Sequence, residues 1–224
     1  MPANRTQPPA KADEQQRPRE RMVETQLAAR DIADPRVLDA MRQVPRHLFV
    51  DEGLLDRAYW DGPLPIGHGQ TISQPYIVAL MTQALGLRGT ERVLEVGFGC
   101  GYQTAVLARL ASEVYAVERI AALFEKGRAN LRAQGIENVR LKLGDGSLGW
   151  EEHAPFDAVL VAAYTRNVPE LLRSQLSTCG RLIIPLGDRD SQLLVLYGKN
   201  AHGEVTRKVM AACRFVPLVK NGSP

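Results

Sequence analysis

The residues best suited to chemistry begin with a glycine-rich stretch, Glu95-Val96-Gly97-Phe98-Gly99-Cys100-Gly101. It follows a short apolar run that predicts a buried strand, and it precedes a helical pattern. Glycines at such a turn let the backbone bend tightly and approach a ligand closely. The spacing is G-x-G-x-G, which differs from the G-x-G-x-x-G of dinucleotide-binding proteins. The stretch also lacks the lysine of a phosphate-binding P-loop.

Two acidic positions follow at later strand ends. Glu118 ends the next predicted strand, where a carboxylate can accept hydrogen bonds from two ribose hydroxyls. Asp145-Gly146 ends the strand after that. Because the carboxyl ends of parallel strands share one edge of a sheet, we expect both features to meet the glycine-rich turn in one crevice. An adenosine ligand without phosphates suits this set, which indicates S-adenosylmethionine.

A second candidate motif is GQTISQPY at residues 69–76, inside a Gly- and Pro-rich stretch at 61–75 that predicts a long loop. Ser73 precedes a predicted helix, so its hydroxyl is placed to cap that helix. A helix N-terminus also presents unpaired N–H groups to anions, and a serine there can help to hold an anionic substrate. Structural and functional interpretations of Ser73 are both open at this point.

The elements that must position these residues alternate between strands and helices. We expect strands at 92–96, 113–118, 138–143, 157–163 and 181–185, helices at 102–111, 120–135 and 169–176, and an antiparallel pair at 192–197 and 205–216. Such alternation predicts a mainly parallel sheet wrapped by helices. Upstream, Asp34-Pro35 begins one helix and apolar spacing over 77–85 predicts another.

The domain organisation follows from composition along the 224 residues. Residues 1–21 are polar, with little to bury, and are expected to form a disordered tail. We expect residues 22–224 to form a single domain whose N-terminal helical segment, 22–89, lies on the substrate side. No apolar run approaches the roughly 18 residues of a membrane span.

Charge and cysteine usage exclude several classes of function. The net charge is +3, but five basic and three acidic residues lie within residues 1–21, which leaves a nearly neutral body. Without a basic stripe among aromatic residues, nucleic acid is not an expected partner. Cys100, Cys179 and Cys213 form no CxxC pair, which favours a reducing, cytoplasmic location. The four histidines lack ligand spacing, so no metal is expected.

These stretches together resemble the protein-L-isoaspartate O-methyltransferase family. The resemblance spans about residues 22–218, and it is carried by GQTISQPY at 69–76, EVGFGCGYQTAVL at 95–107, VYAVERI at 114–120, GDGSLGW at 144–150 and APFDAVLV at 154–161. The serine loop is specific to that family, whereas the glycine motif is general to methyltransferases. The resemblance implies an α/β fold of the class I S-adenosylmethionine-dependent methyltransferases. That fold is Rossmann-like, with a mainly parallel seven-stranded sheet, helices on both faces, and its last two strands in an order reversed from most relatives.

The resemblance also implies an activity and a set of site residues. The expected reaction moves a methyl group from S-adenosyl-L-methionine to the free carboxylate of L-isoaspartyl and D-aspartyl residues in damaged proteins and peptides. It leaves S-adenosyl-L-homocysteine and starts repair through a succinimide. Ser73 is implied as the catalytic serine. The implied cofactor-binding residues are Thr71, Glu95, Gly97, Gly99, Gly101, Glu118, Asp145 and Gly146. We expect a monomer that binds no membrane.

The chain departs from the family pattern at a few positions near the expected pocket. Phe98 and Cys100 stand where the family usually has Thr and Ser, and 162–164 read Ala-Ala-Tyr in place of Thr-Ala-Ala. These changes bear on cofactor affinity and substrate range more than on the reaction. Three alternatives remain. They are a carboxyl methyltransferase for an aspartate of a specific modified peptide, a nucleic-acid methyltransferase, and a non-catalytic S-adenosylmethionine-binding module.

Overall fold

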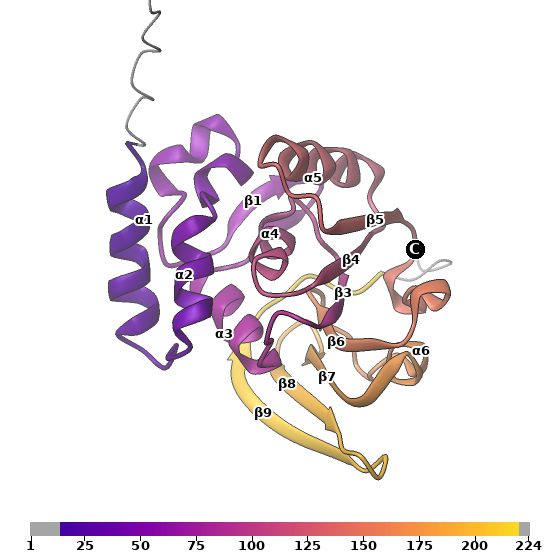
Figure 1. The fold of residues 1–224 in the computed structure, drawn as a ribbon. Helices are drawn as coiled ribbons and strands as arrows, with labels where there is room; N and C mark the ends of the chain where they lie inside the picture. The colour runs from indigo at the N-terminus through magenta and orange to yellow at the C-terminus, as the bar shows by residue number, and fades with distance from the viewer. Residues whose placement is uncertain (1–13, 220–224) are drawn as a thin grey trace, which may run out of the picture.

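A seven-stranded sheet forms the centre of the computed structural model, which describes residues 14–219 (Figure 1). The strand order is β5-β4-β3-β6-β7-β8-β9. The parallel strands are β3 (Arg92–Val96), β4 (Glu113–Glu118), β5 (Val139–Leu143), β6 (Phe156–Val161) and β7 (Leu176–Gly187). Antiparallel pairing adds β8 (Gln192–Lys199) and β9 (Val205–Cys213). The expected mainly parallel sheet is confirmed, and its last strands follow in chain order.

Two apolar layers lie on opposite faces of this sheet, because alternate residues of a strand point in opposite directions. Val93 of β3 belongs to the layer under α3 (Pro75–Leu85), α4 (Tyr102–Ala108) and α5 (Ala121–Ala133). Its neighbour Leu94 belongs to the other layer. That second layer is covered by α6 (Glu170–Ser174), by the residues around the short 3-10 turn η5 (Glu151–His153), and beside them by η4 (Gly146–Leu148).

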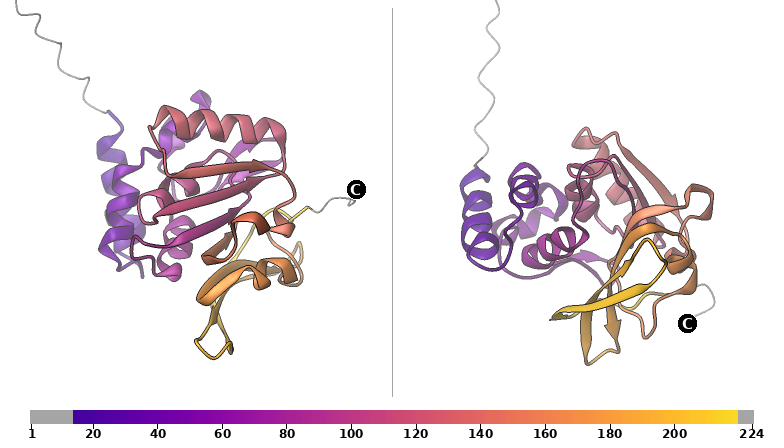
Figure 2. Two further views of the ribbon diagram at one scale, coloured as in Figure 1. Left: turned by 45° about the vertical axis from the view of Figure 1, so that its right-hand side comes forward. Right: turned by 60° about the horizontal axis from the view of Figure 1, so that its bottom comes forward.

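An additional helical layer lies outside α3 and α4. It contains α1 (Gln16–Met22), the π-helical η1 (Val23–Ala28), α2 (Pro35–Gln43), and the 3-10 turns η2 (Arg46–Phe49) and η3 (Glu52–Arg57). Figure 2 shows this indigo and purple layer on one side of the molecule. As predicted, the Asp34 side chain caps α2 by accepting the N–H of Arg36. Among the described residues, no helix is both long and apolar enough to cross a membrane.

The N-terminal boundary differs from the expected one. The prediction that residues 1–21 form a disordered tail is wrong from Gln16 onward, because these residues form α1. Arg19 donates a hydrogen bond to the hydroxyl of Tyr59 at 3.4 Å, and α1 continues directly into the buried Val23. The contact with Tyr59 and the buried turn that follows thus hold the polar residues of α1 in a helix. Residues 1–13 lie outside the described range, and the division into one domain from residue 22 stays a prediction.

The predicted loop at 61–75 contains a small antiparallel hairpin. Its strands are β1 (Leu64–Gly67) and β2 (Gln70–Ile72), joined by a turn in which His68 has a φ of 53°. Leu64 and Ile66 are buried while Pro65 between them is exposed. This hairpin precedes α3 directly, so it presents Ser73 at the start of that helix.

Candidate active site

A hollow of about 870 Å³, part of it open to solvent, lies at the carboxyl edge of the parallel strands. Open α/β sheets bind ligands at this edge. The wall is formed by the turns after β3 and β4, the start of η4, the β1–β2 hairpin, and residues 216–219. Six of the predicted site residues line it, namely Thr71, Ser73, Gly97, Gly99, Glu118 and Gly146. Glu95, Gly101 and Asp145 do not form part of the wall.

The glycine-rich turn after β3 depends on backbone conformations that other residues rarely adopt. Gly97, Gly99 and Gly101 have φ values of 84°, 53° and 90°. A Cβ at Gly99 would lie 3.0 Å from the Cδ1 atom of Ile66 in the hairpin. The glycines therefore serve two purposes: they allow the turn, and they let the hairpin close onto it.

Glu118 fixes this turn from the end of β4. Its carboxylate accepts backbone N–H groups from Gly99 at 2.9 Å, Arg119 at 2.8 Å and Ile120 at 2.9 Å. A carboxylate offers about four acceptor positions. Glu118 also lines the hollow, where its remaining acceptor position is available to a ligand. The residue thus both supports the turn and provides an anionic acceptor at the pocket wall.

Glu95 is an acid in the interior of the protein. It is fully buried, and neither carboxylate oxygen has a hydrogen bond within the described part of the chain. Burial raises its pKa to about 8; the nearby Thr104 hydroxyl lowers the pKa, and the negative charge of Glu118 raises it by a smaller amount. This acid lies next to Val96 and Gly97 of the pocket wall, and a ligand with positive charge there would favour loss of its proton and pair with the carboxylate. The sulfonium and ammonium groups of S-adenosylmethionine meet this requirement, so the residues present fit that cofactor.

The raised pKa of Glu95 predicts a pH dependence of folding. Between about pH 5 and 8 the folded chain keeps a proton that the unfolded chain has lost, so stability falls as the pH rises through this range. Glu95→Gln removes the titration and is expected to flatten this part of the profile. Urea unfolding of both proteins across this range measures the difference. Parallel declines in the two proteins would contradict the assignment of the titration to Glu95.

Asp145, Gly146 and Gly101 are needed for packing around the hollow. The Oδ1 atom of Asp145 accepts hydrogen bonds from the N–H and the hydroxyl of Ser147, and thereby caps η4. A Cβ at Gly146 would lie 2.3 Å from the Cγ1 atom of Val96. At Gly101, which begins α4, a Cβ would lie 3.0 Å from Leu131 of α5. Of these three predicted cofactor positions, only Gly146 lines the hollow. Gly101 and Asp145 support the backbone around it.

Gly146→Ala is expected to destabilise the fold. The added methyl group would overlap a buried side chain of β3, and overpacking of this kind costs about 1–3 kcal/mol. Urea unfolding measures the loss. The matched control is Gly53→Ala, because a Cβ at Gly53 would meet no atom within 4 Å. Equal unfolding midpoints for the two variants would contradict the close approach at Gly146.

Ser73 does not cap α3. The N-cap residue of that helix is Gln74, and no side chain caps its backbone. The Nε2 atom of Gln74 instead donates to the Oδ1 atom of Asp61 at 2.7 Å, and Asp61 forms an ion pair with Arg30. Ser73 lines the hollow, and its hydroxyl bonds to no residue that the structure describes. The capping interpretation is therefore wrong, and the Ser73 hydroxyl is available to a ligand.

The unusual residues of the glycine-rich turn are accommodated by their neighbours. The buried Phe98 packs against Phe124 of α5, with ring centroids 5.8 Å apart. A Cβ at Gly127 would lie 2.6 Å from the Phe98 ring, so a glycine makes room for it. Cys100 is also buried, and burial raises the pKa of its thiol to about 11. The thiol is thus protonated at neutral pH, which agrees with a packing role.

The C-terminal part of the wall is not predictable from the sequence. Residues 216–219 reach the hollow because Tyr164, after β6, binds them through its backbone. The Tyr164 N–H donates to the carbonyl of Val216 at 2.8 Å, and its carbonyl accepts the N–H of Leu218 at 2.7 Å. No local signal in the sequence joins these two distant segments. Tyr164 is also one of the departures from the family pattern. Its contact with residues 216–219 is made by backbone atoms and not by its side chain.

Residues 14–219 contain no group of three or more His, Cys, Asp or Glu side chains that could hold a metal ion. His47 contacts the hydroxyl of Tyr59 at 2.7 Å, and His153 packs against aromatic rings. His68 is exposed at the hairpin turn. None of these histidines lines the hollow. The arrangement offers an acceptor-lined pocket with a serine hydroxyl and no histidine base.

The chain is similar to known proteins over most of its length. Residues 16–223 match the model of the family described as protein-L-isoaspartate(D-aspartate) O-methyltransferase. A protein-L-isoaspartate O-methyltransferase of Geobacter metallireducens is 53% identical over 201 residues, which cover 90% of this chain and 93% of the relative. One of Methylorubrum extorquens is 55% identical over 202 residues, covering 90% of this chain and 88% of the relative.

Solved structures give the same result. A protein-L-isoaspartate O-methyltransferase superposes with a TM-score of 0.81 and 30% identity, covering 91% of this chain and 66% of that longer chain. A Plasmodium falciparum structure described under the same activity, in complex with S-adenosyl-L-homocysteine, has a TM-score of 0.77 and 28% identity. The match covers 91% of this chain and 99% of that one.

Proposed function

The chain belongs to the protein-L-isoaspartate(D-aspartate) O-methyltransferase family, and from this premise we propose how its own residues carry out the reaction. It transfers a methyl group from S-adenosyl-L-methionine to the free carboxylate of L-isoaspartyl and D-aspartyl residues in damaged proteins and peptides. The product S-adenosyl-L-homocysteine remains, and the methyl ester starts repair through a succinimide. The observation that carries the residue assignment is one hollow that joins the glycine-rich turn, Glu118 and the available Ser73 hydroxyl.

On the cofactor side, each residue has a role that its surroundings support. Glu118 accepts a hydrogen bond from a ribose hydroxyl at the acceptor position that the three backbone N–H groups leave. Burial keeps a proton on Glu95 in the free protein, and the positive charge of a bound cofactor favours loss of that proton, so Glu95 becomes a negative partner for the sulfonium and ammonium groups on binding. The absence of side chains at Gly97, Gly99 and Gly146 permits close approach. Thr71 contributes from the hairpin, while Gly101 and Asp145 hold the surrounding backbone.

On the acceptor side, Ser73 orients the carboxylate. When bound, the cofactor supplies a methyl group activated by its sulfonium. An isoaspartyl carboxyl has an ordinary pKa near roughly 4, so it is ionised at neutral pH and needs no general base. Ser73 donates a hydrogen bond to one carboxylate oxygen and leaves the other free to accept the methyl group. Orientation of this kind contributes on the order of 7–11 kcal/mol in favourable cases. The bond must stay moderate, because the carboxylate loses its charge in the transition state.

A pair of peptides tests the proposed function. One contains an isoaspartyl residue, and its twin contains a normal aspartyl residue in the same sequence. With labelled S-adenosylmethionine, only the isoaspartyl peptide is expected to gain a base-labile methyl ester. Methylation of neither peptide, with cofactor binding retained, would favour a non-catalytic module. Equal methylation of both would favour a carboxyl methyltransferase of different specificity.

The reaction without a base predicts a flat pH profile. Single-turnover methyl transfer with saturating cofactor and peptide is expected to change little between about pH 6 and 8. A histidine base would instead give a tenfold fall per pH unit below a pKa of roughly 6.5. His68, in the hairpin that carries the serine loop, is the histidine to test, by comparing the wild type with His68→Gln. If the logarithm of the wild-type rate rose by one per pH unit below this pKa, and the rise disappeared in His68→Gln, the proposal that no base is needed would be wrong.

We further propose that the chain acts as a monomer in the cytoplasm, on proteins and peptides and not on nucleic acid or membranes. The free cysteines Cys100, Cys179 and Cys213 support a reducing compartment. The nearly neutral body of the chain supports a protein substrate over a nucleic acid. Light scattering of the purified protein measures the oligomeric state directly.

A further inference from the structure

A second hollow, about 1760 Å³ by the same measure, opens beside helix α1. One wall is made by residues 15–26 of α1 and η1, and the other by residues 56–64, which lead from η3 into β1. We call this hollow the α1 groove. The reaction proposed above uses none of its side chains.

The α1 groove carries unbalanced positive charge. Arg17, Arg21 and Arg57 line it, and none of them forms an ion pair with an acidic group that the structure describes. Two acids lie in the same walls. Asp61 is already paired with Arg30, so Asp56 is the acidic group that remains. An occupant with negative charge therefore complements this surface.

An exposed tryptophan lies among these arginines. The side chain of Trp60 is 59% exposed, which is the largest fraction among the exposed large apolar residues of the described chain. The guanidinium carbon of Arg57 lies 5.8 Å from the centroid of its ring. Aromatic and arginine side chains are the types that most often anchor polypeptides at interfaces. The combination suits a polypeptide with acidic side chains.

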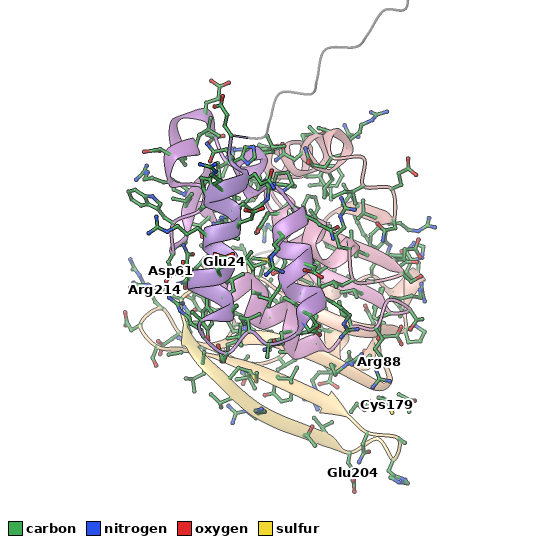
Figure 3. All side chains as sticks on the ribbon, turned by 60° about the vertical axis from the view of Figure 1, so that its left-hand side comes forward. Glu24, Asp61, Arg88, Cys179, Glu204 and Arg214 are labelled. Atoms are coloured by element: carbon green, nitrogen blue, oxygen red, sulfur yellow. The ribbon has the colours of Figure 1, made fainter. Side chains whose placement is uncertain are left out.

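One hydrogen bond links the wall of the groove to the residue beside Ser73. Asp61 forms part of the groove wall, and its Oδ1 atom accepts the hydrogen bond from Gln74, the residue next to Ser73. Asp61 is labelled in Figure 3, which views the molecule from the side of the N-terminal helices. A peptide whose isoaspartyl carboxylate reaches Ser73 can thus extend past Asp61 into the groove.

We propose that the α1 groove binds the substrate polypeptide next to its isoaspartyl residue and favours acidic side chains there. The inference rests on the proposed function, because it names the substrate class for that same site. Arg17, Arg21 and Arg57 attract the flanking acids, and Trp60 packs against the peptide. Damaged segments rich in Asp and Glu are then preferred over neutral or basic ones.

The test compares isoaspartyl peptides that differ only in flanking charge. A neutral peptide with glutamine flanks is matched with versions carrying glutamates, or lysines, on either the N-terminal or the C-terminal side. On the side that enters the groove, glutamates are expected to raise kcat/KM about fivefold over the neutral peptide, since exposed charge pairs contribute modestly. Lysines there lower kcat/KM, and added salt reduces both effects.

Variants connect this preference to the groove. In Arg21→Gln/Arg57→Gln, and separately in Trp60→Ala, the ratio of kcat/KM for acidic to neutral peptide is measured. The ratio is independent of the fraction of folded enzyme. In the double variant, the ratio of kcat/KM for acidic to neutral peptide is expected to be close to one. In Trp60→Ala, KM is expected to rise for every peptide. The control is Arg207→Gln on the β8–β9 hairpin, which is expected to keep the wild-type ratio.

Each outcome decides the proposal. Equal kcat/KM for all peptides in the wild type, or a wild-type ratio in the double variant, would overturn the role of the α1 groove. In either case methylation of the neutral isoaspartyl peptide would leave the proposed function standing. If no isoaspartyl peptide were methylated, the proposed function itself would fail.

Discussion

Replacing Glu118 by alanine is expected to weaken cofactor binding by roughly 10- to 100-fold. The reason is the position of its carboxylate, which holds the N–H groups of Gly99, Arg119 and Ile120 and also faces the hollow. Alanine removes a charged acceptor for a ribose hydroxyl. It also leaves three backbone donors at the turn without their acceptor, so the turn that must contact the cofactor loses its support.

Calorimetric titration with S-adenosyl-L-homocysteine measures this effect without turnover. Thermal unfolding of the same variant separates the two contributions, since loss of the turn alone lowers the melting temperature. The control is Glu125→Ala, which removes an exposed acid of α5 that is paired with Arg128 on the same helix. An affinity equal to that of the wild type in Glu118→Ala would refute the assignment of this carboxylate to the cofactor.

The parts of the fold that the sequence predicts well are those fixed by local pattern. The bounds of β3 and β4 agree with the predicted 92–96 and 113–118, because each is a short buried run between clear turn residues. Gly97 and Gly99 were predictable for the same reason: a strand, a tight turn and a helix follow one another directly. The position of Glu118 follows from that pattern, since parallel strands end at one edge.

The parts that it does not predict depend on contacts between distant segments. The β1–β2 hairpin is formed by strands of only four and three residues, in a stretch whose Gly and Pro content indicates a loop. Its closure over the turn depends on Ile66 against Gly99, and on Lys126 of α5, which donates to the carbonyl of Ile66 at 3.3 Å. The approach of residues 216–219 depends in the same way on Tyr164. Such contacts have no local signature.

The structure decides between two interpretations of Ser73, which are helix capping and substrate binding. On sequence alone, Ser73 is expected to cap α3, and capping does not exclude substrate binding. The backbone of the structure begins α3 at Pro75 with Gln74 as its N-cap, so the serine lies one residue too early to cap. The side chain of Gln74 instead donates a hydrogen bond to Asp61, and this bond holds the loop in place. The loop is held without the serine hydroxyl, which faces the hollow.

Ser73→Ala is accordingly expected to lower turnover of an isoaspartyl peptide by roughly 10- to 100-fold, because misplacement of a reacting group by about 1 Å can cost two orders of magnitude. Affinity for S-adenosyl-L-homocysteine and the free energy of unfolding are expected to stay close to the wild type, since no described residue depends on that hydroxyl. A capping serine would behave in the opposite way, with a loss of about 1 kcal/mol in stability and nearly normal turnover. The control for the loss of a serine as such is Ser174→Ala in α6, which removes a hydroxyl bonded to the Leu171 carbonyl, and neither residue lines the hollow. Wild-type turnover in Ser73→Ala would remove this residue from the reaction, and the orientation of the acceptor carboxylate would then have to come from the backbone N–H groups at the start of α3.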